Sequence, residues 1–187
     1  MSDPEHAASP EINLAIIGLR GSGKSTLGAG LARQCGFVFV DADDSVLDRF
    51  QESSFVDVMR VHGEAAWRQA ETVVAREIVE GAGQLISMGG GMPIIPEVQL
   101  LMQEAREAGS LIVIYLDAPV DLLQQRLAAQ PGDRSTLTGM GLIEEIEAIS
   151  VDRDPVYRAM ADIIFSVQDE PIAATLQRMA KLVVGEG

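Results

Sequence analysis

The sequence predicts a three-layer α/β/α fold with a five-stranded, largely parallel sheet. Short apolar segments of strand length alternate along the chain with longer segments of helical periodicity. This alternation is typical of parallel strands whose two faces are both covered by helices. At 187 residues the chain has the length of one domain with a single core. We therefore expect one domain over residues 12–187, preceded by a flexible polar tail over residues 1–11.

Apolar segments bounded by turn-forming residues predict the strands. They cover residues 13–19, 37–40, 84–88, 110–116 and 163–167. The first strand runs into a glycine-rich turn, the second ends in a pair of aspartates and the third ends in a glycine triplet. We expect residues 37–40 to be buried, because all four are apolar.

Helical periodicity predicts the remaining elements. They cover residues 25–34, 45–50, 55–79 with a break near Ser53 and Ser54, a segment with Val98, Leu101, Met102 and Ala105 on one face, and residues 120–129, 142–161 and 172–184. Gly36 is placed to end the first helix as a C-terminal cap. Gly28 and Gly30 lie inside that helix and predict close packing against the sheet. Residues 130–141 are rich in turn formers and predict a mobile loop, or lid.

The amino-acid composition indicates a globular protein and argues against some classes of partner. Hydrophobic residues make up 47% and charged residues 22%, as in ordinary globular domains. The net charge of −14 argues against nucleic acid or an anionic membrane as a general partner. The chain has no apolar run of the ~18–20 residues that a membrane span needs, and its start lacks the features of a secretory signal. We expect a cytoplasmic monomer, in which the single cysteine, Cys35, is a small buried hydrophobe.

A phosphate-binding loop is the strongest motif in the sequence. Residues 18–25 read Gly-Leu-Arg-Gly-Ser-Gly-Lys-Ser, with an apolar strand before them and a helix after them. The backbone N–H groups of such a loop, with the positive end of the helix dipole, hold the phosphates of a nucleotide. We expect the nucleotide to contact Gly21, Ser22, Gly23, Lys24, Ser25 and Thr26. The motif is shared by GTPases, ATPases and small-molecule kinases, so it leaves the reaction open.

Within this loop, two residues have predicted chemical roles. Lys24 is expected to reach the β- and γ-phosphates as a point charge, and the Ser25 hydroxyl is expected to ligate Mg²⁺. Asp41 and Asp43 follow the second strand two residues apart, so their side chains point the same way and suit a metal ion and a substrate hydroxyl. The plainer alternative is that one aspartate only caps the next helix, and we assign that role to Asp44.

Arg68 has two possible roles. It stands three residues before Glu71 and four after Glu64 on a predicted helix. A solvated salt bridge to either glutamate is the better interpretation from the residues alone. His62 lies in the same region without an evident partner.

The phosphate loop, the aspartate pair and the glycine triplet each follow a predicted strand. Ligands of parallel α/β sheets bind outside the carboxyl ends of the strands. These three segments are therefore expected to meet at one edge of the sheet.

The order of these motifs resembles the shikimate kinase family. Behind the phosphate loop come Asp41-x-Asp43, Gly63-Glu64-x-x-Trp67-Arg68-x-x-Glu71, the triplet Gly89-Gly90-Gly91, Arg134, and Arg153-x-Pro155-x-Tyr157. The resemblance covers about residues 13–185. It implies a P-loop kinase fold that uses ATP and Mg²⁺ and transfers the γ-phosphoryl group to the 3-hydroxyl of shikimate, in aromatic amino-acid biosynthesis.

The resemblance also implies roles for single residues. Asp43, Arg68, Gly89, Gly90, Gly91 and Arg153 would hold shikimate. Arg126 would lie near the adenine and Arg134 over the phosphates, so that Lys24, Asp43 and Arg134 form the catalytic set. Asp41 would face the metal with Ser25, and Asp117 would be a structural residue rather than a second magnesium ligand. The alternatives are another small-molecule kinase, such as a gluconate kinase-like enzyme, or a nucleotide-binding module without turnover.

Overall fold

The computed structural model describes residues 11–129 and 142–184. Its five strands form one sheet in the order β2-β3-β1-β4-β5. They are β1 (Asn13–Ile17), β2 (Val38–Asp41), β3 (Gln84–Ser87), β4 (Leu111–Asp117) and β5 (Ile163–Ser166). Every neighbouring pair is parallel. The predicted fold class is confirmed.

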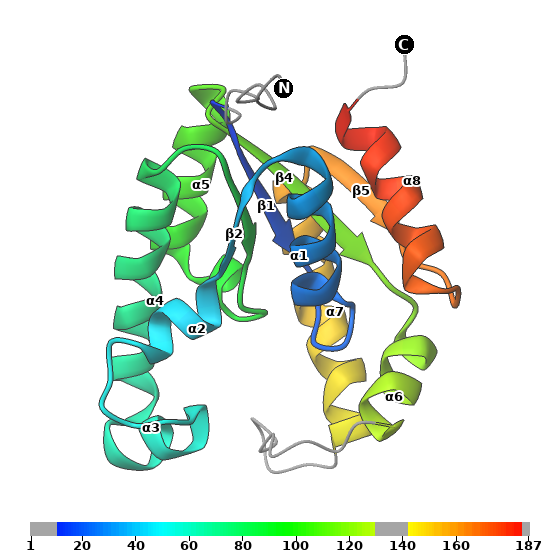
Figure 1. Ribbon diagram of the computed structural model, residues 1–187. Helices are drawn as coiled ribbons and strands as arrows, with labels where there is room; N and C mark the ends of the chain where they lie inside the picture. The colour runs from blue at the N-terminus through cyan, green and yellow to red at the C-terminus, as the bar shows by residue number, and fades with distance from the viewer. Residues whose placement is uncertain (1–10, 130–141, 185–187) are drawn as a thin grey trace, which may run out of the picture.

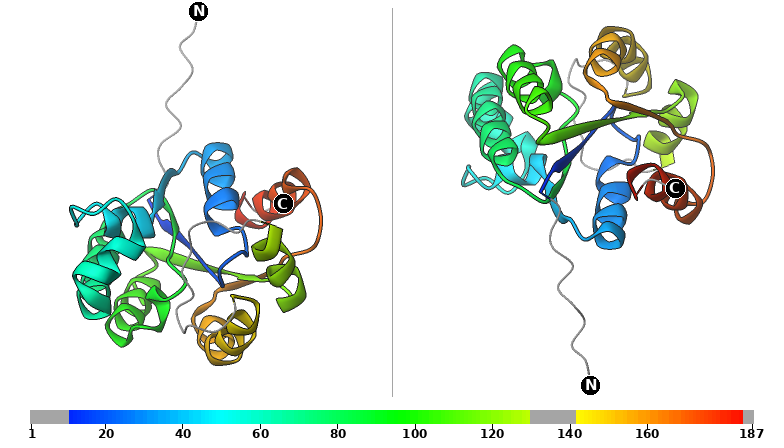
Figure 2. Two further views of the ribbon diagram at one scale, coloured as in Figure 1. Left: turned by 90° about the horizontal axis from the view of Figure 1, so that it is seen from below. Right: turned by 90° about the horizontal axis from the view of Figure 1, so that it is seen from above.

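Helices cover both faces of the sheet (Figure 1). They are α1 (Lys24–Cys35), α2 (Ala42–Leu47), α3 (Phe55–Val61), α4 (Gly63–Glu80), the short 3-10 helix η1 (Met92–Ile94), α5 (Pro96–Glu107), α6 (Val120–Ala129), α7 (Leu142–Met160) and α8 (Ile172–Val184). Figure 2 shows α1 and α8 on one face, and α5 and α7 on the other. None of the helices in the described part of the chain is long and apolar enough to cross a membrane.

The core lies on both sides of β1, the central strand. All five residues of β1 are buried, and apolar side chains of β3 and β4 continue the buried layer. Burial of both faces removes far more apolar area from water than burial of one face, which explains the continuous apolar sequence of these strands.

The second strand was predicted to be buried, and this prediction is wrong. β2 is an edge strand, and Val38 at its start is 61% exposed. Apolar composition marks a strand but does not give its place in the sheet, because an edge position depends on which strands pair.

The start of helix α2 also differs from the prediction. The helix begins at Ala42 rather than near Ser45, and its N-terminal cap is Asp41, whose Oδ1 accepts a hydrogen bond from the Asp43 N–H at 3.1 Å. Asp44, predicted as the cap, lies within the first turn. The side chains of Asp41 and Asp43 therefore project from a strand end and a helix turn, not from one strand.

The predicted helix over residues 55–79 is two helices. Gly63 has a φ of +78°, a left-handed conformation that breaks the helix between α3 and α4. His62 stands at this break, and its Nε2 lies 3.0 Å from a carboxylate oxygen of Glu52. His62, for which the sequence showed no evident partner, therefore has one in the fold.

The two glycines inside α1 mark close approaches. A methyl group on Gly28 would lie 2.8 Å from the ring of Phe39 on β2, as the predicted packing on the sheet requires. A methyl group on Gly30 would lie 2.8 Å from Leu176 of α8. Gly30 thus packs against a helix, not the sheet. Gly36 caps α1 with a φ of +78°, as predicted.

Candidate active site

A cavity of about 980 Å³ opens at the carboxyl ends of the strands. Its walls come from the turn between β1 and α1, from α2 and α4, from the glycine triplet after β3, and from α6 and α7. In Figure 1 these segments lie toward the lower side of the molecule. Because β2, β3 and β1 are neighbours in the sheet, the segments that follow them meet here. The predicted convergence is confirmed.

The phosphate loop folds as a turn of glycines with positive φ. Gly18, Gly21 and Gly23 have φ angles of 151°, 83° and 99°, which residues with a Cβ rarely adopt. The loop leads directly into the first turn of α1, where orphan N–H groups and the helix dipole attract anions. The local backbone is therefore that of a phosphate site.

Lys24 lies over this loop. Its Nζ donates hydrogen bonds to the Gly18 carbonyl at 3.0 Å and to the Leu19 carbonyl at 3.1 Å. Burial lowers the pKa of Lys24 from 10.5 to about 8, although Asp43 and Asp41 nearby oppose that change. The ammonium is still protonated at neutral pH, and an anion that enters the loop finds it already in place.

The Ser25 hydroxyl donates a 2.6 Å hydrogen bond to Asp41 Oδ2 and lies 3.2 Å from the Ser87 hydroxyl. The two residues predicted to hold Mg²⁺ are therefore adjacent. The described residues contain no group of three or more histidine, cysteine or acidic side chains that would suit a metal. A hard cation such as Mg²⁺ fits this site, because it commonly takes one or two protein oxygens and completes its shell with phosphate and water.

Asp43 lies on the first turn of α2 and lines the cavity. Its carboxylate stands against Gly89, where a methyl group would overlap it. Burial raises the pKa of Asp43, and the charge of Lys24 opposes the rise. The side chain is exposed to the cavity, so a small molecule can reach it, and the protein atoms around it displace part of its water.

Arg68 both pairs with glutamates on its own helix and faces the cavity. It forms ion pairs with Glu64 at 3.2 Å and with Glu71 at 2.8 Å, and it also lines the cavity. The pair with Glu64, whose side chain is 66% exposed, is the solvated bridge that the sequence favoured, whereas the Glu71 side chain is only 2% exposed. A methyl group on Gly91 would overlap the Arg68 guanidinium. The glutamate fixes the arginine against the triplet.

Arg153 approaches the same triplet from helix α7. Its Nη1 donates a 2.7 Å hydrogen bond to the Gly90 carbonyl. The hydroxyl of Tyr157, one turn further along α7, donates a 2.5 Å hydrogen bond to the same carbonyl. Tyr157 is fully buried. No role was predicted for Tyr157, although its place four residues after Arg153 puts both side chains on one helix face.

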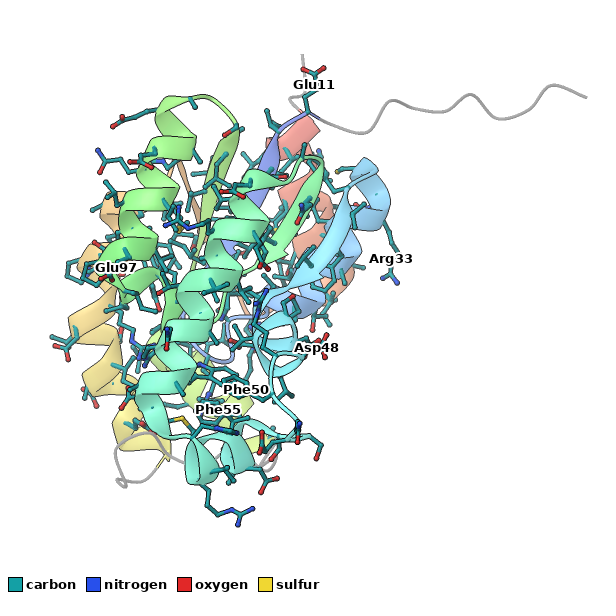
Figure 3. The ribbon with its side chains drawn as sticks, turned by 90° about the vertical axis from the view of Figure 1, so that its left-hand side faces the viewer. Glu11, Arg33, Asp48, Phe50, Phe55 and Glu97 are labelled. Carbon is teal, nitrogen blue, oxygen red and sulfur yellow. The ribbon has the colours of Figure 1, made fainter. Side chains whose placement is uncertain are left out.

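Aromatic side chains close the cavity beside Arg68. Trp67 stacks on Phe50 with ring centres 6.2 Å apart and meets Phe55 edge to face at 4.9 Å. Figure 3 shows Phe50 and Phe55 near each other at the end of α4 where α3 packs. Phe55 and Trp67 both line the cavity. These rings give the part of the site around Arg68 an apolar wall.

The remaining predicted residues lie near the phosphate loop. Arg126 of α6 lines the cavity and donates a 3.3 Å hydrogen bond to the Gly21 carbonyl. Thr26 also lines the cavity. Arg134 and the predicted lid over residues 130–141 lie outside the described residues. Asp117 pairs with Arg158 at 2.7 Å and does not line the cavity as the described residues define it, which agrees with a structural role.

Comparison with known proteins decides the family. The sequence pattern of the family described as shikimate kinase matches residues 20–183. The chain belongs to the shikimate kinase family. The expected class of enzyme, an ATP-dependent small-molecule kinase, is thereby confirmed, and so is the resemblance drawn from the motifs.

Individual relatives agree with this membership of the shikimate kinase family. Shikimate kinase 2 of Escherichia fergusonii is 38% identical over 175 residues, which cover 89% of this chain and 93% of the relative. A shikimate kinase of Synechococcus is 31% identical, covering 92% of this chain and 85% of the relative.

Solved structures agree as well. The shikimate kinase of Acinetobacter baumannii in complex with shikimate has a TM-score of 0.82 at 25% identity, and covers 94% of both chains. A gluconokinase of Sinorhizobium meliloti has a TM-score of 0.53 at 14% identity, covering 93% of this chain and 96% of that one, which shows a shared fold alone.

Proposed function

We propose that this chain transfers the γ-phosphoryl group of ATP to the 3-hydroxyl of shikimate, giving shikimate 3-phosphate and ADP in aromatic amino-acid biosynthesis. One observation carries the choice of acceptor. Arg68 from α4 and Arg153 from α7 both reach the glycine triplet, in the same cavity as the phosphate loop. A gluconate kinase-like enzyme would instead be favoured by arginines far from the triplet.

The two arginines suit the acceptor's carboxylate. A guanidinium is planar and always charged, so it grips a carboxylate through two parallel hydrogen bonds. Arg68 is held by Glu71, and Arg153 is held by the Gly90 carbonyl. Both cations are therefore oriented before the acceptor binds, which lowers the entropy lost on binding. The glycines of the triplet lack side chains and let the acceptor approach the backbone closely.

Asp43 is proposed to orient the attacking hydroxyl and to take its proton late in the transfer. Its carboxylate stands between Lys24, which acts on its pKa, and Gly89 of the triplet. The raised pKa makes the carboxylate a better proton acceptor than a solvated aspartate. Transfer through a loose transition state needs little more than position and charge neutralisation.

The nucleotide is proposed to lie on the phosphate loop and the start of α1. Lys24 would move its hydrogen bonds from two loop carbonyls to the phosphates, where its charge offsets the charge of the transferring group. Ser25 and Asp41 would hold Mg²⁺, which neutralises phosphate charge when it is bound. Arg126 would flank the base, and Arg134 is proposed from the sequence to act on the phosphates.

An assay of ADP release with shikimate, quinate and gluconate as acceptors tests the proposal. We expect release with shikimate far above release with the other two, and a product whose ³¹P signal is that of shikimate 3-phosphate. Faster release with gluconate would support the gluconate kinase-like alternative. Nucleotide binding without release for any acceptor would identify a module without turnover.

A further inference from the structure

Helix α7 carries two pairs of side chains that reach two parts of the sheet edge. Arg153 and Tyr157 contact the Gly90 carbonyl beyond β3. Asp154 and Arg158, each one position later, contact the end of β4. Residues four apart share a helix face, so the rotation of α7 about its axis sets both contacts together.

The contact with β4 is a connected network. The Tyr115 hydroxyl donates to Asp154 Oδ1 at 2.8 Å, and Arg158 Nε donates to Asp154 Oδ2 at 2.8 Å. Arg158 Nη2 also donates to Asp117 Oδ2 at 2.7 Å, and the Arg158 guanidinium lies 5.6 Å from the centre of the Tyr115 ring. Tyr115, Asp117, Asp154 and Arg158 are called the α7 anchor below.

The buried hydroxyl of Tyr115 makes the anchor more than a surface ion pair, although its three charged side chains are partly exposed. Tyr115 is 2% exposed, so its hydroxyl would be left without water if Asp154 were removed. Burial acts to raise the pKa of Asp154, but hydrogen bonds from Arg158 and Tyr115 outweigh it and hold that pKa below its ordinary value. The carboxylate is therefore charged at neutral pH, when the network is intact.

Pro155 interrupts the backbone hydrogen bonding of α7 beside the anchor. Pro155 has no N–H, so α7 lacks a backbone hydrogen bond next to Arg153 and Asp154. The side chains of the anchor hold the helix where its backbone is least held. The ring of Tyr115 also packs on the ring of Tyr157, with centres 5.3 Å apart, which joins the anchor to the side chain that holds Gly90.

We propose that the α7 anchor fixes the rotation of α7 and so positions Arg153 and Tyr157 for acceptor binding. Arg153 lines the cavity, whereas the four anchor residues do not line it as the described residues define it. They are positioning residues that act through Arg153 and Gly90. The inference rests on the proposed function, because Arg153 is there a ligand of the acceptor.

Asp154→Ala and Tyr115→Phe test the positioning role in steady-state kinetics. We expect the KM for shikimate to rise about 3- to 10-fold, as for the loss of an internal hydrogen bond, while kcat and the KM for ATP stay close to wild type. Asp154→Asn keeps an acceptor for Tyr115 and loses the charge that Arg158 meets, so its KM should lie between those of Asp154→Ala and wild type.

Arg106→Gln is the matched control. It breaks an ion pair with Asp162, 2.6 Å long, which joins α5 to the residue before β5, at the opposite end of the strands from the cavity. We expect lower stability and an unchanged KM for shikimate. An equal rise in this variant would show that any lost ion pair weakens acceptor binding, and would overturn the proposal.

Hydrogen exchange of the backbone amides over residues 89–95 gives a readout that does not depend on turnover. Faster exchange is expected in Asp154→Ala and Tyr115→Phe, but not in Arg106→Gln, because the Gly90 contact loosens. If the wild type phosphorylates shikimate, an unchanged KM in both anchor variants overturns the inference. If the wild type does not phosphorylate shikimate, the proposed function fails, and exchange decides: faster exchange supports positioning, and unchanged exchange overturns it.

Discussion

Ser25 and Asp41 are joined by a 2.6 Å hydrogen bond between the start of α1 and the end of β2. Asp41 also caps α2 through its other carboxylate oxygen. One side chain therefore serves the proposed metal site and the stability of a helix, and a suitable substitution separates these two roles.

Asp41→Asn is expected to raise the Mg²⁺ concentration needed for half-maximal activity while leaving the melting temperature near that of wild type. Asparagine is as good a helix cap as aspartate but is a weaker ligand for a hard cation. Asp41→Ala should in addition lose about 1 kcal/mol of the free energy of unfolding, since alanine cannot cap. Activity as a function of Mg²⁺, with thermal melts of both variants, checks this. An unchanged Mg²⁺ requirement in both would exclude Asp41 from the metal site.

Lys24 is expected to make nucleotide binding depend on pH. The pKa of Lys24 is about 8 in the free protein, and phosphates that bind beside the ammonium raise it. ADP affinity should therefore fall as pH rises above 8, and ADP binding should take up a proton at pH 9. Titration calorimetry in two buffers of different ionisation enthalpy measures that proton. Lys24→Arg keeps its charge at all these pH values, so its binding should take up none.

The lowered pKa of Lys24 also determines whether its contribution to folding stability rises or falls with pH. The unfolded chain keeps the Lys24 proton up to about pH 10.5, whereas the folded chain releases it near 8. The unfolded state thus binds more protons between these values, and the contribution of Lys24 to folding becomes more favourable as pH rises through that window. Lys24 is also expected to matter for turnover. Lys24→Ala should lower kcat about 10²- to 10³-fold, because the ammonium offsets charge on the transferring phosphoryl group, and a steady-state assay of the folded variant measures this.

Arg68→Lys and Arg153→Lys are expected to weaken shikimate binding much more than ATP binding. Each variant keeps its positive charge but loses the planar fork that matches a carboxylate. Calorimetric titration of each ligand into each variant separates the two affinities. Unchanged shikimate affinity in both variants would rule out the carboxylate clamp and point to a different acceptor.

Gly91→Ala is expected to weaken acceptor binding and to cost some stability. Gly91 has an ordinary φ of −91°, so alanine causes no backbone strain there. Its methyl group would overlap Nη1 of Arg68, so the guanidinium must move and its pair with the buried Glu71 is strained. Gly90→Ala is the comparison, since its methyl would meet Arg153 at an ordinary 3.5 Å. Equal KM values for shikimate in the two variants would contradict this account.

Arg134→Ala is expected to lower kcat substantially with a modest loss of ATP affinity. The Arg134 guanidinium is proposed to stabilise the phosphate charge that develops in the transition state, so its loss should affect kcat more than ATP binding. Single-turnover rates and ADP affinity check this. Wild-type turnover in the variant would remove Arg134 from the catalytic set.

Local motifs allowed most of the site to be predicted. The phosphate loop is contiguous, and its glycines and helix start are short-range properties that residues 18–25 carry by themselves. The strand ends could also be placed, because polar and glycine-rich segments follow apolar ones. The cap of α2 was placed wrongly, since Asp41, Asp43 and Asp44 all suit a cap and their sequence does not choose among them.

Contacts between residues far apart in the sequence could not be predicted from local sequence patterns. Arg68 was predicted to form a solvated salt bridge, and its pair with the exposed Glu64 is one, but it also pairs with the buried Glu71 and reaches Gly91. Arg68 makes both kinds of contact because α4 packs beside the triplet. The spacing of residues along a helix does not predict which segment that helix packs against. Tyr157 likewise gains its role only from the fold, which brings α7 to Gly90.

The residues alone were enough to predict the succession of strands and helices, the phosphate loop and the family. These follow from hydrophobic periodicity and from backbone preferences within a few residues. The folded chain was needed to see that β2 is an edge strand, that Arg68 and Arg153 meet at one triplet, and that Asp154 bonds α7 to Tyr115. These arrangements join segments tens of residues apart, and their partners depend on how the helices pack on the whole sheet.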